Sequence, residues 1–127
     1  MKNENFKNLI LNKSFNFSLQ LIKFVGSFAN DNILRIIKDQ LLRAGFSIGA
    51  NIAEAQGGSS KADFKNFIHH AYKSSIETRY WLALTEKSNL SVNKIILNDL
   101  IIRVKELSKI LTSIVLTLKG KKTINSS

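Results

Sequence analysis

The chain contains no proline in its 127 residues, and this absence favours long, uninterrupted helices. Proline lacks a backbone N–H and its ring clashes with the preceding turn, so helix interiors exclude it. An average protein of this size would carry several prolines, at about 5 % of residues. A coding bias toward Lys, Asn and Ile would also deplete proline. The absence therefore needs independent support from the pattern of apolar residues.

That support comes from apolar residues that recur every three or four positions along four stretches, which is the period of an amphipathic helix. The pattern is clearest in the second stretch, at Leu34, Ile37, Leu41, Ala44, Ile48, Ile52 and Ala55. We predict helices over residues 13–29, 32–55, 61–88 and 92–119, with loosely ordered termini. The alternation of apolar and polar residues that is typical of strands does not compete with this assignment.

Short polar segments separate the four stretches. Residues 30–32 read Asn-Asp-Asn, residues 56–59 read Gln-Gly-Gly-Ser, and Ser60 is placed to cap the third helix with Asp63. Ser91 is placed to cap the fourth helix. Short connections force consecutive helices to run antiparallel. We therefore predict an all-α fold, an up-down-up-down four-helix bundle that forms a single domain over residues 1–127.

Two glycines lie inside the second predicted helix, at Gly45 and Gly49. Each costs a helix about 1 kcal/mol relative to alanine. The simplest compensation is close approach of another helix, either from the same subunit or from a neighbouring one.

The charge of the chain is strongly unbalanced, with 19 Lys and Arg against 9 Asp and Glu, for a formal net charge of +10. Such an excess favours a polyanionic partner, nucleic acid first and a membrane surface second. A lysine-rich composition without any such partner is the alternative. The fourth stretch adds scattered cations at residues 103, 105, 109 and 119. The candidate nucleic-acid-binding residues are Arg35, Lys38, Arg43, Lys61, Lys65, Lys73 and Arg79, each of which could equally belong to a solvated helix face.

No apolar run in the sequence approaches the roughly 18 residues that a membrane-spanning helix requires, and the first residues do not resemble a signal peptide. The chain also has no cysteine. We expect a cytoplasmic protein without a membrane partner.

Motifs of enzymatic chemistry are missing. There is no Glu-x-x-His pair for a di-iron bundle, no nucleophile elbow and no arginine four to six residues before a histidine, as helical ribonucleases carry. His69 and His70 are adjacent, so they point about 100° apart on a helix and are interpreted as a surface or core-edge pair of undetermined function. Tyr72, Tyr80 and Trp81 could stack on bases, although such aromatics belong more often to a core or an interface. We expect a protein that is not an enzyme and uses neither metal nor cofactor.

The segment from Gln40 to Ala55, which reads QLLRAGFSIGANIAEA, resembles the signature of the 23S rRNA intervening-sequence proteins, a family of four-helix bundles. The same family includes the accessory variability determinant (Avd) proteins of diversity-generating retroelements. The resemblance continues through residues 60–64 and then at Phe67, Ala71 and residues 75–77. Two positions depart from the pattern: the family usually has proline where Gly49 stands, and commonly has glycine where Ala55 stands.

The resemblance implies a homo-oligomer, a pentamer in known family folds, that binds RNA or DNA through a basic surface. In the retroelement branch it implies binding to a reverse transcriptase, and it implies no known catalysis. Its polar signature residues are Arg43, Ser47, Asn51, Glu54 and Glu77. The first four share one helical stripe, so we interpret them as hydrogen-bonding residues that fix helix packing, with direct ligand contact as the alternative.

The predicted function is therefore that of a non-enzymatic, oligomeric protein that binds nucleic acid. The alternative is a protein-interaction scaffold, such as an accessory subunit of a reverse transcriptase.

Overall fold

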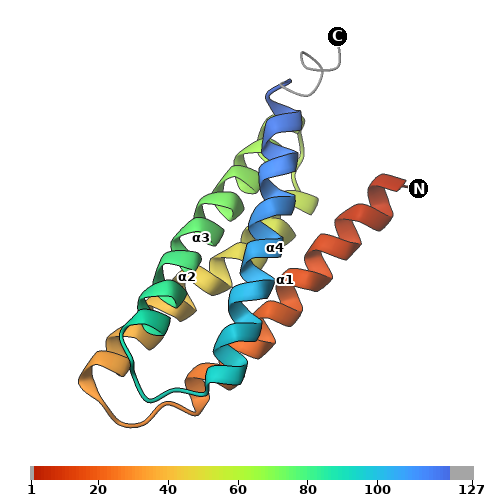
Figure 1. Cartoon of the computed structure of the whole chain (residues 1–127). Coiled ribbons are helices and arrows are strands. Elements are labelled where there is room, and N and C mark those ends of the chain that lie inside the picture. The colour runs from red at the N-terminus through yellow and green to blue at the C-terminus, as the bar shows by residue number, and fades with distance from the viewer. Residues whose placement is uncertain (1, 121–127) are drawn as a thin grey trace.

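The computed structural model describes the backbone of residues 2–120 and the side chains of residues 7–120. Within this range the chain forms four helices and no strand: α1 (Lys2–Gly26), α2 (Asn32–Gln56), α3 (Lys61–Lys87) and α4 (Lys94–Leu118) (Figure 1). The fold is an all-α four-helix bundle, as predicted. The predicted disorder of residues 121–127 lies outside the described part of the chain.

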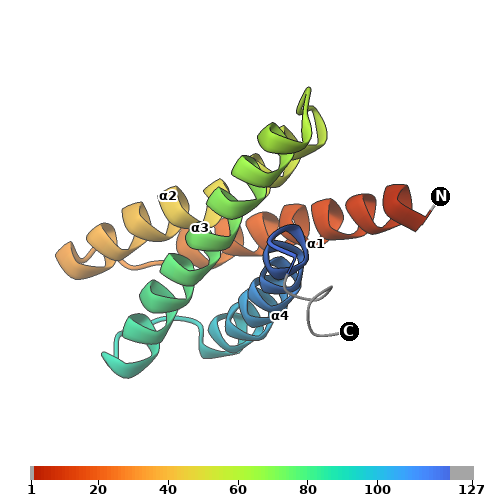
Figure 2. The ribbon, with the colours of Figure 1, turned by 90° about the horizontal axis from the view of Figure 1, so that it is seen from above.

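The helices follow one another around the bundle. α1 packs on α2, α2 on α3 and α3 on α4, and α4 closes the ring against α1. The two diagonal pairs make no close backbone contact within residues 2–120. Seen from above, α3 and α4 cross the direction of α1 at a marked angle, and the N-terminal end of α1 diverges from the other helices (Figures 1 and 2).

The predicted start of α1 at residue 13 is wrong, because the helix already begins at Lys2. The early residues contribute to packing: Ile10 is buried in the core, and the Gln56 side chain donates a hydrogen bond to the Lys7 carbonyl at 2.8 Å. The stretch before Lys13 is mostly polar apart from the apolar run at residues 9–11, so it shows too little apolar periodicity to predict this part of the helix.

The other helix ends differ less from the prediction. α1 ends at Gly26 rather than at residue 29. α4 begins at Lys94 rather than at residue 92, because the side chain of Asn93, and not that of Ser91, accepts the capping hydrogen bond from the Ile96 N–H. The caps of the middle helices are Asp31, which accepts from the Leu34 N–H, and Ser60, which accepts from the Asp63 N–H.

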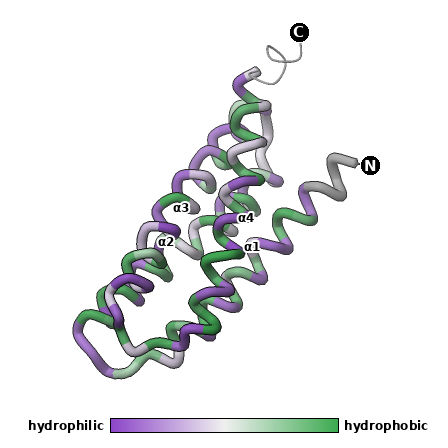
Figure 3. Tube along the Cα trace, in the orientation of Figure 1, coloured by the Kyte–Doolittle hydropathy of each residue, from purple (hydrophilic) through white to green (hydrophobic). Residues whose placement is uncertain are grey.

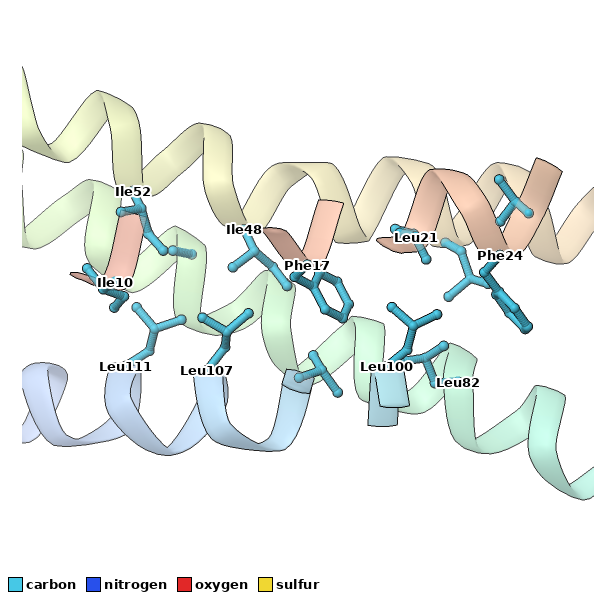
Figure 4. Packing of buried hydrophobic residues seen from close by; sticks show 14 of the residues in the cluster. Ile10, Phe17, Leu21, Phe24, Ile48, Ile52, Leu82, Leu100, Leu107 and Leu111 are labelled. Carbon is cyan, nitrogen blue, oxygen red and sulfur yellow. The ribbon is translucent and has the colours of Figure 1, made fainter. Parts of the chain in front are cut away.

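One continuous core runs along the bundle axis, and all four helices contribute to it (Figure 4). Its largest fully buried side chains include Phe17 and Phe24 from α1, Ile48 from α2, Leu82 from α3 and Leu107 from α4. Figure 3 shows apolar positions alternating with polar ones along each helix. Burial of these aliphatic and aromatic side chains is the main term that stabilises such a bundle.

Gly45 explains how α1 and α2 approach each other. A β-carbon added at Gly45 would overlap the side chain of Leu21, and one added at Gly49 would lie 3.3 Å from the Ser14 hydroxyl. Both glycines therefore face α1 of the same subunit. The helix-propensity cost of the two glycines is offset by the close packing that they allow.

Candidate nucleic-acid interface

The signature residue Arg43 joins α2 to α3. Its guanidinium donates to the Gln40 side chain at 2.8 Å and forms an ion pair with the Glu77 carboxylate. The same carboxylate accepts a hydrogen bond from the Trp81 indole at 3.0 Å. The positive charge of Arg43 is thus paired with a carboxylate of the neighbouring helix, while its side chain remains 58 % exposed.

This geometry also changes the ionisation of Glu77. The hydrogen bond from Arg43, followed by that from Trp81, lowers the pKa of the Glu77 carboxyl below its usual value of 4.5. Both donors stabilise the charged form of the carboxylate more than the neutral form. Glu77 therefore holds α2 and α3 together as an anion.

Two further signature residues form a second link between α2 and α3. The Asn51 amide donates to the backbone carbonyl and to the hydroxyl of Ser47, at 2.8 and 2.9 Å. The hydroxyl of Ser74 on α3 donates to the Ser47 hydroxyl at 2.8 Å. Glu54 has no hydrogen bond or ion pair to another described side chain and is exposed. Four of the five signature residues therefore take part in hydrogen bonds at the α2–α3 contact.

Arg35 and Lys38 are the other two candidate cations on α2, and their surroundings differ from those of Arg43. Arg35 donates to the side chains of Asn32 and Asn30 at its own helix start, at 2.9 and 3.1 Å. Lys38 is half-buried and lies seven and eleven residues before the two glycines that face α1, hence on the α1 side of α2. Arg35 therefore contacts residues at the start of its own helix, Lys38 lies toward α1, and Arg43 is paired with Glu77 of α3.

The α3 candidates are exposed, and three of them line the outer side of the contact with α4. Lys61, Lys65 and Arg79 are spaced by four and fourteen residues, which are close to whole helical turns. Lys105 and Lys119 on α4 are also fourteen residues apart, with Lys109 one turn beyond Lys105. We call this surface the α3–α4 cationic face, made of Lys61, Lys65, Arg79, Lys105, Lys109 and Lys119. Lys73, the fourth exposed candidate, lies farther around α3.

Two shallow grooves between α3 and α4 bring members of this face together. One, of about 420 Å³, is lined by Lys65, His69 and Lys119. The other, of about 310 Å³, is lined by Arg79, Tyr80 and Lys105, and also by the carboxylate residue Glu86. The three α4 lysines were visible in the sequence only as scattered charges. Their alignment with α3 depends on how the two helices pack.

The carboxylates of α3 and α4, with the exception of Glu86, are turned away from this face. Asp63 accepts from Ser59 at 2.8 Å in the α2–α3 turn, and Glu77 binds Arg43. On α4, Asp99 accepts from Gln20 of α1 at 2.9 Å, and Glu106 pairs with Lys13 of α1 at 3.2 Å. Ion pairs and hydrogen bonds thus draw the negative charges toward α1 and α2, which leaves the α3–α4 side cationic.

The two histidines do not converge. His69 lines the α3–α4 groove, with its ring centroid 6.1 Å from that of Tyr72, whereas His70 lines a different hollow beside Lys73. Among the described residues, no cluster of three or more His, Asp or Glu side chains is placed to share a metal ion. No helix in residues 2–120 is long and apolar enough to cross a membrane.

Comparisons with known proteins identify the family and the fold of this chain. The family model described as 23S rRNA-intervening sequence protein matches residues 7–113. This chain belongs to that family. A crystal structure of a protein of unknown function from the S23 ribosomal protein family of Bacteroides thetaiotaomicron shares 32 % sequence identity, with a TM-score of 0.77. The alignment covers 86 % of this chain and 96 % of that one. No curated protein sequence matches this chain.

The two departures of this chain from the family pattern lie in or next to the core. Gly49 lies against Ser14, where the absence of a β-carbon permits close packing of α1. Ala55 is 3 % exposed and contributes its methyl group to the core. Neither residue belongs to the α3–α4 cationic face, so the departures concern packing rather than the candidate interface.

Proposed function

We propose that this protein binds RNA or DNA, without catalysing a reaction on it, through the α3–α4 cationic face. One observation carries the proposal: the six cations of this face gather along one helix pair, while four of the five carboxylates of α3 and α4 are engaged elsewhere. The family to which the chain belongs is named for an rRNA element, which supports RNA as the first candidate. From such a partner we also infer that the protein is cytoplasmic.

The physical basis is the attraction between lysine and arginine side chains and successive phosphates. Cations at backbone spacing bind nucleic acid without reading its sequence, and the release of condensed counterions makes the affinity fall steeply with salt. Tyr80 is 60 % exposed and lines the groove beside Arg79. An exposed aromatic next to an arginine can stack on an unpaired base, which favours single-stranded over fully paired nucleic acid.

The test compares two triple variants that lose the same charge. We expect Arg79→Ala/Lys105→Ala/Lys109→Ala to weaken binding of a fluorescent single-stranded RNA by about 10- to 100-fold at low salt, with a shallower salt slope. The control Lys23→Ala/Arg35→Ala/Lys38→Ala removes three cations from α1 and α2. It should weaken binding only slightly. Fluorescence anisotropy across a salt series measures both.

Equal losses in the two triple variants would show that only net charge matters and would overturn the assignment to this face. Absence of binding to RNA and to DNA by the wild-type protein at low salt would overturn the proposal itself.

We also propose that the protein assembles into a homo-oligomer through the outer face of α1 and α2, with five subunits as the family resemblance implies. Phe15, Leu19 and Ile22 on α1 are 62, 52 and 51 % exposed, and Phe46 on α2 is 38 % exposed. Gly45 packs against α1, and Phe46 is the next residue along α2. Phe46 therefore lies at about the same height along the bundle as the exposed residues Phe15, Leu19 and Ile22 of α1. A group of exposed aromatic and aliphatic side chains of this kind is typical of an interface between proteins.

Light scattering tests the assembly directly. The wild-type mass should be about five times the 14.3 kDa of one chain, and Phe15→Gln/Leu19→Gln should reduce it toward a monomer. The matched control Ile95→Gln/Ile102→Gln removes two exposed isoleucines from α4, at 82 and 69 % exposure, and should leave the mass unchanged. A monomeric wild-type protein would contradict self-assembly. The apolar face would then favour the alternative function, docking of another polypeptide such as a reverse transcriptase.

A further inference from the structure

The divergence of α1 from the other helices leaves a large cleft at one end of the bundle. Its volume is about 1020 Å³, and its walls come from the start of α1, the end of α2, the start of α3 and the end of α4. Figure 1 shows the four segments around this end, where the α2–α3 turn also lies. We call it the end cleft. Its volume is at the upper end of the range typical of small-molecule sites, about 300–1,000 Å³.

The inner wall of the end cleft is aliphatic. Ile10, Ile52 and Ile68 come from three different helices and form the floor of the cleft, but they are only 3, 1 and 2 % exposed and offer little surface to a ligand. The apolar surface that a ligand can reach comes chiefly from the half-buried side chains of Ile114 and Leu118 on α4. Such a wall favours a hydrocarbon chain. The polar edge of a nucleobase would leave its hydrogen-bonding groups unpaired against these side chains.

The rim of the end cleft is cationic. Lys7 from α1 and Lys61 and Lys65 from α3 line it, and no Asp or Glu is among the lining residues that the structure describes. The ammonium of Lys7 lies 5.2 Å from the centre of the Phe64 ring, so a cation–π contact holds this charge at the edge of the cleft. The nearest carboxylate along α3, Asp63, is occupied by the hydroxyl of Ser59 at 2.8 Å.

From this complementarity we propose that the end cleft binds an amphipathic anion with a long aliphatic chain, of the class of free long-chain carboxylates. The aliphatic chain lies on Ile114 and Leu118, and the carboxylate lies among Lys7, Lys61 and Lys65. A charged head paired with several cations at a solvated rim avoids the cost of burying an unpaired charge. The proposal does not depend on nucleic-acid binding, whose test uses Arg79, Lys105 and Lys109.

The experiment titrates dodecanoate into the full chain by calorimetry, below the concentration at which dodecanoate forms micelles, with dodecanol as the uncharged probe. We expect saturable binding of dodecanoate and weaker binding of dodecanol. Lys7→Ala/Lys61→Ala should weaken dodecanoate binding by about tenfold and leave dodecanol unaffected, because only the charged head meets the rim. The control Lys23→Ala/Lys38→Ala removes two cations outside the cleft and should change neither.

A second pair of variants tests the apolar part without disturbing the core. Thr117 is exposed and lines the end cleft, so Thr117→Trp should fill it and abolish binding of both probes. Ser113 is exposed on the same helix outside the cleft, and Ser113→Trp should retain binding. No saturable dodecanoate binding by the wild-type protein would overturn the proposal. Equal losses in the Lys7/Lys61 variant and its charge control, or full binding by Thr117→Trp, would overturn it as well.

Discussion

At the scale of single residues, Glu77 is a charged side chain on α3 that two donors engage at once. It accepts from Arg43 of α2 and from Trp81 one turn along its own helix. Its side chain is 38 % exposed and that of Arg43 is 58 % exposed. Solvent therefore screens the ion pair, whose contribution to stability we place at about 0.5–1 kcal/mol. The pair contributes little to the free energy of unfolding, and its main effect is to favour one register of α2 against α3.

The lowered pKa of Glu77 makes a prediction about pH. The unfolded chain takes up the proton near pH 4.5, whereas the folded protein takes it up only at lower pH. The contribution of Glu77 is therefore fully present above that value, and is lost as the pH falls through the lower, folded pKa. Glu77→Gln should unfold at lower denaturant concentration than wild type near neutral pH, with the difference shrinking in acid. Urea denaturation at several pH values measures this.

Glu54→Gln is the control, because Glu54 is exposed and has no such partner among the described side chains. A constant difference between wild type and Glu77→Gln across the acid range would contradict the role of the ionised carboxylate.

At the scale of helices, the contact between α1 and α2 depends on a residue that a helix by itself would disfavour. Glycine at position 45 costs helix propensity, yet a β-carbon there would overlap Leu21. The packing term is larger than the propensity term, because interiors packed to crystal density have little room for a methyl group.

We predict that Gly45→Ala destabilises the protein by about 1–3 kcal/mol, despite alanine's better helix propensity, because Leu21 must leave its position. Gly26 provides the matched control. It ends α1 with no other atom within 4 Å of an added β-carbon, so Gly26→Ala should be neutral within about 0.5 kcal/mol. Thermal or chemical unfolding of both variants measures the difference. A stabilised Gly45→Ala would mean that Leu21 repacks freely and that the close approach of α1 and α2 is not tightly specified.

At the scale of the whole molecule, the two sides of the bundle differ in chemistry. The α3–α4 cationic face lies on one side, and the exposed side chains of Phe15, Leu19, Ile22 and Phe46 lie on α1 and α2. Exposed apolar side chains also occur on α4, at Ile95 and Ile102. Because each helix contacts only its neighbours around the ring, these two faces lie on opposite sides. An assembly joined through α1 and α2 would then present its cationic faces outward, where a polyanion can reach several of them at once.

The two faces should respond differently to salt. Raising the salt concentration from low to physiological should weaken nucleic-acid binding by at least about tenfold, since counterions compete with phosphate contacts. The same change should leave the oligomer mass unaltered or slightly favour assembly, since apolar burial does not depend on ion pairing. Light scattering and anisotropy on one salt series compare them. Dissociation of the oligomer at the higher salt would place charged contacts at the subunit interface.

The amino-acid sequence was enough to predict the helical class and the bundle topology, because helix periodicity is local and does not require knowledge of the partner helices. The family was predicted separately, from the resemblance of residues 40–55 to its signature. The sequence also predicted that another helix, from the same or a neighbouring subunit, lies close to Gly45 and Gly49. The three-dimensional structure was needed to show that the neighbour of Gly45 is Leu21 and that Arg43 is paired with Glu77. It was also needed to show that Lys105 and Lys119 lie beside the cations of α3. These facts depend on the register and crossing of helices far apart in the chain. The helical period predicts on which face of a helix a residue lies, but only the packing of the helices determines which residues that face contacts.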